Sequence, residues 1–326
     1  MNELNKDAAS FLTVGEEAAG QRIDNFLARV LKGVPKSHVY RILRSGEVRL
    51  NKGRVGPEAR LAVGDVVRVP PIRTAAPPMG AAPPPGARRA GEKLPILFED
   101  DVLLVVDKPA GVAVHGGSGI SSGVIEQLRA ARPEGRFLEL VHRLDRETSG
   151  VLLLAKKRSA LVALHAAMRE GGFDKRYLAL VRGKWRDEKR RVRLALHKFS
   201  TTEGERRVRV EDEAGMDAET IFYRRQVWPQ HEPPLALLEA ELLTGRTHQI
   251  RVHLAHLGFP LAGDDKYGDF AWNKALAKEG LKRMFLHARS LRFVHPVSHE
   301  PATFEAPLPA ELAAFVARLD AEAHDA

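Results

Sequence analysis

Residues Val141–Ala155 read VHRLDRETSGVLLLA, and this stretch decides the fold of the longer part of the chain. Five polar or charged side chains, between positions 142 and 147, come directly before a run of Val and Leu. Leu138, Leu140 and Leu144 alternate with polar positions, which is the period of a β-strand. We therefore expect a strand over 138–145, a turn at Thr148–Gly150 and a second, buried strand over 150–157.

Asp145 lies at the expected end of the first strand, where packing would fix the direction of its side chain. Arg143 and Arg146 are close enough in sequence to keep its carboxyl group ionised. A carboxylate in such a place can serve as a general base, a metal ligand or a covalent nucleophile. It can equally cap a turn without any chemical role, and the local pattern alone leaves these alternatives open.

Elsewhere in this part of the chain, segments with the period of a strand alternate with segments with the period of a helix. The strands are short and several are joined by hairpins. This pattern favours an α+β fold with a mixed, largely antiparallel central sheet over a doubly wound fold. Further strands are expected over 101–108, 175–185 and 235–243, and helices over 121–131, 158–172, 247–258 and 309–323.

Composition divides the 326 residues into four segments. Residues 74–94 are mostly Pro, Ala and Gly, which predicts an extended linker between two domains. A small domain is expected at 21–73 after a flexible N-terminus at 1–20, and the longer domain at 95–326. The net charge of +9 is concentrated in the small domain, because Arg22–Arg73 hold 12 Lys or Arg against 4 Asp or Glu. Such a localised charge indicates a polyanionic partner, with nucleic acid the first candidate.

The small domain has two segments of helical periodicity, at 21–31 and 35–46, followed by a hairpin that turns at Asn51–Gly53. The second helix would turn its apolar side chains inward and its basic side chains outward, where they could bind backbone phosphates. Basic side chains that are simply solvated would give the same pattern. The candidates for phosphate contacts are Lys36, Arg41, Arg44, Lys52 and Arg54.

Several classes of function are disfavoured by what the sequence lacks. There are no cysteines, which removes disulfide bonds, thiolate catalysis and cysteine-ligated metals. No apolar run reaches the length of a membrane helix, and the first residues show no signal-peptide pattern, so we expect a cytoplasmic protein without membrane contact. His248, His253 and His256 could suggest a metal site. No carboxylate lies between Leu243 and Gly263, however, so no metal is expected there.

Four motifs of the longer domain occur in an order that is typical of one enzyme family. They are HRLDRETSGVLLLAKK from His142, KRYLALVRG from Lys175, LLTGRTHQIRVHLAHLGFPLAGDDKYG from Leu242 and FLHARSLRFVHP from Phe285. Over 94–308 the chain resembles the RNA pseudouridine synthases, which convert uridine within RNA to pseudouridine. The resemblance implies the pseudouridine synthase fold for this domain.

The resemblance also implies a role for several side chains. Asp145 would be the catalytic carboxylate near C1′ of the ribose, Arg251 its salt-bridge partner, and Tyr177 the ring that stacks on the target base. Leu286 would form a wall of the pocket, and Arg143 would fill the gap left by the flipped nucleotide. The reaction neither gains nor loses atoms, so it implies no cofactor.

Residues 21–70 resemble the S4 RNA-binding domain, which implies structured RNA as the polyanion. Within the synthase family, the chain is most similar to a subgroup that acts on the large ribosomal subunit. This implies several uridines of 23S ribosomal RNA as targets, with 23S ribosomal RNA or large-subunit precursor particles as the partner. Sister subgroups that modify other uridines of ribosomal or transfer RNA share the two-domain plan. We expect the protein to act as a monomer.

Two other interpretations of the same residues remain. Asp145, Glu147 and His142 could form the centre of a metal-dependent RNA hydrolase. Alternatively, the longer domain could be a platform in a ribosome-assembly protein that has no catalytic activity. A metal-dependent hydrolase would be sensitive to chelators, and a platform would not depend on Asp145.

Overall fold

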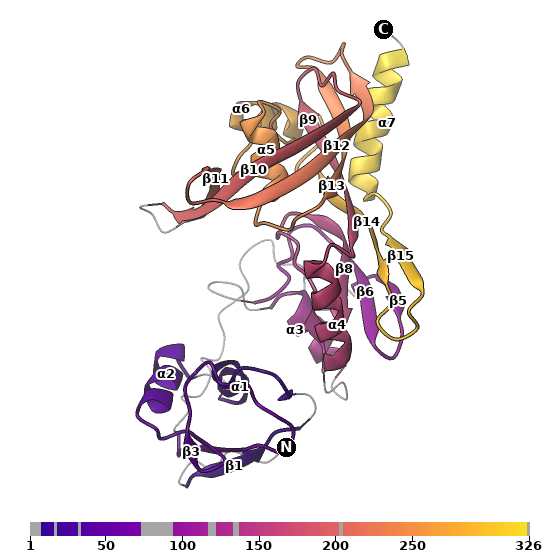
Figure 1. Ribbon diagram of the computed structural model, residues 1–326. Helices are drawn as coiled ribbons and strands as arrows, with labels where there is room; N and C mark the ends of the chain where they lie inside the picture. Colours follow the sequence, from indigo (N-terminus) through magenta and orange to yellow (C-terminus); the bar gives the residue numbers. More distant parts are fainter. Residues whose placement is uncertain are drawn as a thin grey trace. The chain divides into compact units, whose positions relative to one another are not determined.

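The computed structural model describes residues 8–15, 18–31, 34–72, 94–116, 122–132, 137–201 and 205–324. The chain divides into two compact units, Met1–Pro84 and Pro85–Ala326 (Figure 1). The linker expected over 74–94 lies outside the described residues, apart from Leu94. Within the described ranges, no helix is long and apolar enough to cross a membrane.

The first unit is a four-stranded antiparallel sheet, in the order β1-β4-β2-β3, with two helices. Its elements are β1 (Ser10–Thr13), α1 (Ile23–Val30), α2 (Lys36–Arg44), β2 (Arg49–Leu50), β3 (Gly53–Arg54) and β4 (Val66–Val69). Every residue of β1 pairs with β4, and Leu12 is buried in the core of the unit. The expectation of a flexible segment at 1–20 is therefore wrong for β1. Four residues are too few for their alternation to be recognised as a strand in the sequence.

Local sequence explains how this unit closes. Ile23, Phe26 and Leu27 share one face of α1 and are buried, as the helical spacing predicts. Asn51 and Lys52 connect β2 to β3 and have positive φ angles of 49° and 73°. Two consecutive residues of this conformation form the tight hairpin turn that matches the twist of the strands, and Asn is well suited to it. The exposed turn thereby presents the side chain of Lys52 to solvent.

The second unit is built on one eleven-stranded sheet, whose main path runs β11-β10-β12-β13-β9-β14-β8-β6-β5. Strand β15 also pairs with β14, and β7 with β8. Among these pairs only β14 and β8 are parallel, so the expected α+β class with a mixed, largely antiparallel sheet is confirmed. The strands and helices are β5 (Ile96–Glu99), β6 (Leu103–Lys108), α3 (Val124–Ala130), β7 (Glu139–Leu140), β8 (Ser149–Ala155), α4 (Arg158–Arg169), β9 (Asp174–Arg182), β10 (Lys189–Ser200), β11 (Arg206–Val210), β12 (Met216–Trp228), β13 (Leu235–Leu242), α5 (Gln249–His256), α6 (Phe270–Lys278), β14 (Leu286–Val294), β15 (Pro301–Glu305) and α7 (Ala310–His324).

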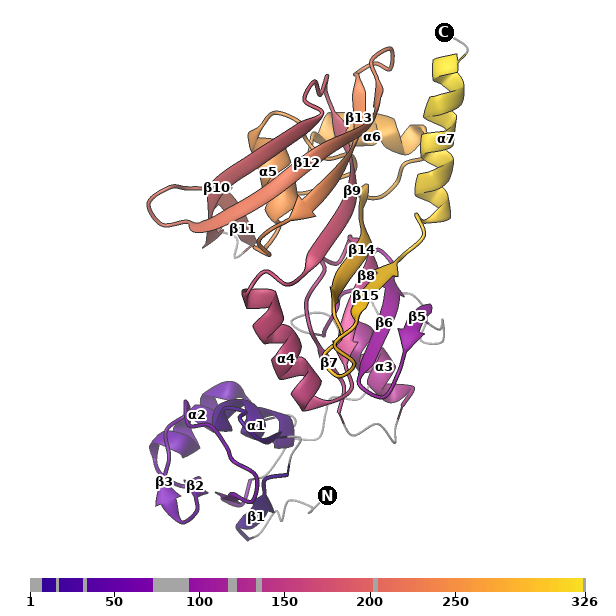
Figure 2. The ribbon, with the colours of Figure 1, turned by 45° about the vertical axis from the view of Figure 1, so that its right-hand side comes forward.

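Helices cover both faces of this sheet (Figure 2). Leu104 and Val106 of β6 pack in the cluster that contains α3 and part of α5, whereas Leu103 and Val105 pack in the cluster that contains α4. Successive strand residues point to opposite faces. β6 and β8 are therefore apolar on both sides, which explains their uninterrupted runs of Val and Leu. Helices α6 and α7 pack together against β9, β12 and β13.

The segment that precedes β8 differs from the expected strand. Strand β7 ends at Leu140, and 141–148 form a loop rather than the end of a strand. The backbone N–H of Val141 still donates to the carbonyl of Leu153, but the N–H of Leu153 donates to Nε2 of His142 at 3.1 Å. A side chain thus takes the hydrogen bond that a continuing strand would have accepted. Asp145 therefore lies on a loop between two strands.

Strand β8 begins with a close approach to β14. A Cβ on Gly150 would lie 2.1 Å from the carbonyl oxygen of Ala288, and Gly150 has a φ of 111°. Only glycine allows both the backbone conformation and the contact. The parallel pairing of β8 and β14 covers just Ser149 and Gly150. It anchors the end of the loop that carries Asp145.

Candidate active site

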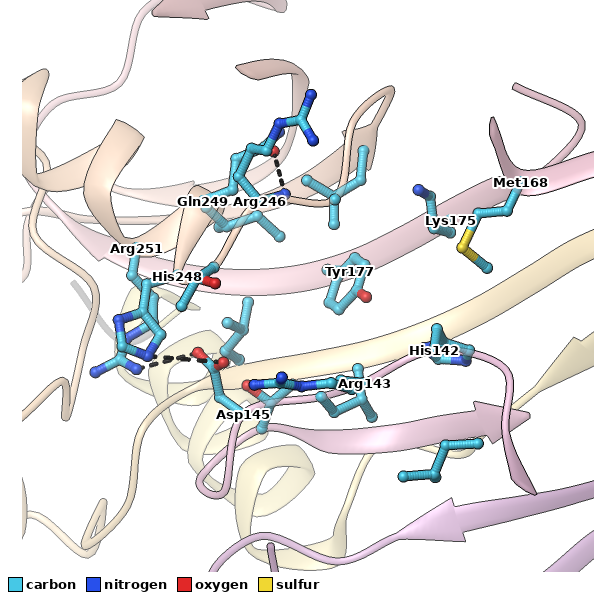
Figure 3. A pocket seen from close by; sticks show the side chains of 18 of the residues that line it. His142, Arg143, Asp145, Met168, Lys175, Tyr177, Arg246, His248, Gln249 and Arg251 are labelled. Carbon is cyan, nitrogen blue, oxygen red and sulfur yellow. Dashed lines mark hydrogen bonds and ion pairs between the residues drawn. The ribbon is translucent and has the colours of Figure 1, made fainter. Parts of the chain in front are cut away.

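Asp145 is held in a turn and faces a cavity. The N–H of Thr148 donates to the Asp145 carbonyl at 3.1 Å, which closes the turn. The carboxylate is partly exposed, and its Oδ2 accepts a hydrogen bond of 3.1 Å from Nη1 of Arg251 on α5. The salt bridge expected between these two residues, 106 positions apart, is present. Figure 3 shows Arg251 and His248 pointing toward the same carboxylate.

Arg251 is shared between two carboxylates. Its Nε and Nη2 donate to the two oxygens of Asp264, both at 2.7 Å, while Nη1 is left for Asp145. Asp264 is fully buried and also accepts the N–H groups of Lys266 and Tyr267. Burial acts to raise the pKa of Asp264, but the hydrogen bonds and charge of Arg251 outweigh it and hold that pKa below its ordinary value. Asp264 therefore stays ionised and fixes the plane of the guanidinium.

The cavity in front of Asp145 has a volume of about 520 Å³. Its lining combines one carboxylate with several cations and an apolar wall. Tyr177 of β9 and Leu286 of β14 form part of that wall and are themselves largely buried. The charged and apolar side chains that line it include Arg143, Asp145, Lys175, Tyr177, Lys198, Leu242, Arg246, Ile250, Arg251 and Leu286. The positively charged part of the lining can bind a polyanion, and the apolar wall can pack against a flat ring.

The phenol of Tyr177 is neutral in this setting. Burial raises its pKa well above the ordinary value, and the nearby charge of Asp145 acts in the same direction. Tyr177 lies on β9 and Leu286 on the neighbouring β14, so both are carried by the rigid centre of the sheet. The site thus joins a carboxylate on an anchored loop to a ring and an aliphatic side chain on paired strands.

Comparisons with known proteins identify the family of this chain. Residues 102–256 match the family model for RNA pseudouridylate synthase, and residues 21–67 match the S4 domain. The ribosomal large subunit pseudouridine synthase C of Haemophilus ducreyi is 51% identical over 96% of this chain and 96% of its own length. The protein of that name from Escherichia coli is 52% identical over 92% of this chain and 93% of its own. The chain belongs to the RNA pseudouridine synthase family.

Solved structures of the family have the same fold. Human RNA Pseudouridylate Synthase Domain Containing 1 superposes with a TM-score of 0.55 at 28% identity, covering 71% of this chain and 96% of that chain. Human RNA Pseudouridylate Synthase Domain Containing 4 also has a TM-score of 0.55, at 25% identity, covering 69% and 93%. The expected synthase fold of the longer domain is confirmed.

The site residues expected for this synthase fall into two groups. Asp145, Tyr177, Arg251, Arg143 and Leu286 all line the single cavity described above, although the first and last are 141 positions apart. The phosphate-contact candidates of the small domain lie in the other unit. Arg41, Arg44, Lys52 and Arg54 are exposed there, whereas the side chain of Lys36 lies outside the described residues.

The residues suggested for a metal-dependent hydrolase are otherwise engaged. His142 accepts the N–H of Leu153, and burial lowers its pKa to about 4. Glu147 pairs with Arg146, whose Nε is 2.8 Å from its carboxylate. In the part of the chain that the structure describes, no three His, Cys, Asp or Glu side chains are grouped as metal ligands.

The structure places three further side chains at or beside the site, and no role there was predicted for them from the sequence. Asp264 follows a glycine, as acidic residues of turns often do, and nothing in the local pattern pairs it with Arg251. Lys108 is fully buried, and its Nζ donates to the carbonyls of Pro109, Val112 and Arg146, so it ties β6 to the Asp145 loop. Burial lowers the pKa of Lys108 to about 7. His248, the third, lies beside Asp145 at the start of α5.

Proposed function

We propose that this synthase isomerises uridines of large-subunit ribosomal RNA to pseudouridine, with Asp145 as the catalytic carboxylate. The observation that carries the proposal is a carboxylate that faces the cavity and accepts a hydrogen bond from Arg251 of α5. The names of the relatives, which are ribosomal large subunit pseudouridine synthases, support ribosomal RNA as the substrate.

The chemistry requires a carboxylate at the sugar of an unstacked nucleotide. The N1–C1′ bond breaks with its electron pair passing to the uracil, the base turns, and C5 bonds to C1′. C5 then loses its proton and N1, which had none while it was bonded to C1′, gains one, so the atoms balance without a co-reactant. Asp145 would act on the ribose, either by bonding to C1′ or by removing the C2′ proton. Both routes need the carboxylate aimed at the sugar, and the hydrogen bond from Arg251 fixes the direction of the carboxylate.

The remaining cavity residues fit the other requirements of this reaction. The largely buried ring of Tyr177 offers a flat face on which a detached uracil can turn, and Leu286 closes the adjacent wall. Arg143 is exposed at the cavity, and no hydrogen bond or ion pair to another described side chain engages it. It is therefore available to occupy the space that a flipped nucleotide leaves in the RNA.

The small domain would supply affinity rather than chemistry. Its four described candidates, Arg41, Arg44, Lys52 and Arg54, are exposed on α2 and on the β2–β3 hairpin, and the S4 match supports RNA as their ligand. We propose 23S ribosomal RNA, or large-subunit particles that contain it, as the partner. A tethered binding domain raises the effective concentration of the catalytic domain near its target uridines. The protein would act as a monomer in the cytoplasm.

Tritium release tests the reaction directly, because bonding at C5 expels the hydrogen of that carbon. Ribosomal RNA labelled at uridine C5 is incubated with the protein in the presence of a chelator. Wild type and Glu147→Gln should release tritium, whereas Asp145→Asn should fall to background. Release by Asp145→Asn at the normal rate would refute the proposed role.

The same experiment separates the alternatives. A metal-dependent hydrolase would cut the RNA, would be inhibited by the chelator and would depend on Glu147. A non-catalytic assembly protein would release no tritium in any form. Sequencing of pseudouridine positions in ribosomal RNA from cells that lack the gene then identifies the target uridines. Loss from transfer RNA alone would contradict the ribosomal assignment.

A further inference from the structure

His248 has an unusual backbone conformation beside Asp145. It is the residue before the first turn of α5, and its φ of 53° and ψ of 23° lie in the left-handed region. Few residues other than glycine adopt this conformation without cost, and such strain persists where the surroundings hold the residue in place. Here the conformation turns the imidazole toward the cavity, where it lines the wall next to Asp145 (Figure 3).

The hydroxyl of Tyr267 is the hydrogen-bond partner of Nδ1 of His248. That oxygen lies 2.8 Å from Nδ1 of His248 and accepts the backbone N–H of Val208 at 2.9 Å. No other acceptor for the hydroxyl proton is found among the described residues. A hydroxyl that donates to Nδ1 leaves a neutral imidazole with its own proton on Nε2. Burial lowers the pKa of His248, which favours the neutral ring.

Nε2 of His248 is directed at the oxygen of Asp145 that Arg251 does not bind. Arg251 contacts Oδ2 at 3.1 Å, whereas Nε2 lies 3.8 Å from Oδ1. A separation of 3.8 Å is too long for a hydrogen bond, but a displacement of less than about 1 Å would form one. Distances in active sites commonly shorten when the substrate binds.

We propose that neutral His248, protonated on Nε2 and held by Tyr267, is a positioning residue that donates to Oδ1 of Asp145 when RNA occupies the site. With Arg251 on Oδ2, the carboxylate would then be fixed at both oxygens and unable to rotate. Because the position of Val208 on β11 sets the Tyr267 hydroxyl, the edge of the sheet would also help to aim the carboxylate. This inference rests on the proposed role of Asp145.

Two substitutions of His248 separate the hydrogen bond from the backbone. The side-chain amide nitrogen of Gln is separated from Cα by as many bonds as Nε2 of His, so His248→Gln keeps a donor toward Asp145. The side-chain amide nitrogen of Asn is separated from Cα by as many bonds as Nδ1 of His, so His248→Asn keeps only the contact with Tyr267. Asn, however, tolerates the left-handed backbone better than Gln. If the hydrogen bond to Asp145 matters, His248→Gln should be more active than His248→Asn. If only the left-handed backbone matters, the order should be the opposite.

Tritium release under saturating and limiting RNA gives kcat and KM for each variant. We expect His248→Gln to retain kcat within about threefold and His248→Asn to lose about ten- to a hundredfold, the usual effect of one hydrogen bond to a charged group. KM should change less than about threefold in both. Equal kcat in the two variants, or a higher kcat for Asn, would overturn the proposal.

The tautomer can be measured without RNA or activity. Nitrogen NMR of the full-length protein labelled in histidine should show His248 protonated on Nε2, and Tyr267→Phe should remove this preference. In the double variant His248→Asn, Tyr267→Phe, the loss of kcat should be no larger than in His248→Asn alone. Protonation on Nδ1 in wild type, or additive losses, would refute the relay. An absence of tritium release by wild type would instead refute the proposed function, while the NMR result stands alone.

Discussion

Replacing Asp264 with Asn should damage both the stability and the reaction, for one structural reason. Asp264 and Arg251 are both buried and are joined by two hydrogen bonds of 2.7 Å. Removing the charge of Asp264 leaves Asp145, at the edge of the cavity, as the carboxylate to which the guanidinium is still hydrogen-bonded. The amide can still accept one hydrogen bond, but it cannot hold two N–H groups of Arg251 in one plane.

The size of the effect follows from these contacts. Breaking a buried ion pair by removing one partner costs about 3 to 5 kcal/mol, and the retained acceptor places Asp264→Asn near about 3 kcal/mol. For a domain of this size, that corresponds to a fall in Tm of about 6 to 12 °C. A catalytic group displaced by about 1 Å can lose about a hundredfold in rate, so kcat should fall by about that factor.

The assay is tritium release at a temperature where circular dichroism shows both proteins folded. Asp265→Asn is the matched control, because Asp265 is exposed and lies 3.7 Å from the same guanidinium. A pair of that kind contributes at most about 1 kcal/mol, so Tm and kcat should stay near wild type. If Asp264→Asn lowers Tm but leaves kcat within twofold, Asp264 supports the fold alone. If neither value changes, the reasoning from burial is wrong.

Three further outcomes are expected. His253 is fully buried without a hydrogen-bond partner among the described residues, and burial lowers its pKa from 6.5 to about 4. The contribution of neutral His253 to the unfolding free energy is therefore complete above pH 6.5 and is lost as the pH falls through 4. In urea unfolding, His253→Leu should therefore reduce the loss of unfolding free energy at acid pH by up to about 3 kcal/mol, whereas the same change at exposed His256 should not. Identical dependences of unfolding free energy on pH in the two variants would contradict this. Gly150→Ala should lower the unfolding free energy by at least about 3 kcal/mol, because its Cβ would collide with the β14 backbone at a positive φ, and a normal urea midpoint would show that the strands can separate at little cost. Changing Arg41 and Arg44 to Gln should reduce the slope of log affinity against log salt for a structured fragment of ribosomal RNA by about 1.4 to 1.8. An unchanged slope would mean that these side chains of α2 do not contact phosphate.

The sequence predicted helices and strands best where the pattern of neighbouring residues along the chain determines the element. The apolar runs of β6 and β8 identify strands buried on both faces, and the helical spacing of 23–31 identifies α1. These patterns depend on local periodicity, which is fully contained in the sequence. The fold class could be predicted for the same reason, since short strands joined by hairpins lead to a largely antiparallel sheet.

Prediction was weaker where a contact links distant segments. The segment 138–145 has the alternation of a strand, yet the ring of His142 takes a hydrogen bond that would have continued the pairing. Strand propensity cannot anticipate such a competitor, because its partner, Leu153, belongs to the next strand. The order of the family motifs suggested the pairing of Asp145 with Arg251. Asp264 stands in the same motif as Arg251, but the motif alone does not show that their side chains form an ion pair, which arises from the fold.

The division of Arg251 between two carboxylates explains why so many contacts converge on the loop of Asp145. Asp264 uses Nε and Nη2 and so fixes both the position and the plane of the guanidinium. The direction of Nη1 is then fixed as well. Because the guanidinium cannot rotate, the loop must place the carboxylate of Asp145 where Nη1 can donate to it. The loop is accordingly held at both ends of the turn, by Lys108 at the carbonyl of Arg146 and by the β8–β14 pairing at Ser149. A change at either anchor should therefore reduce activity even though neither touches the cavity wall that would receive the uracil.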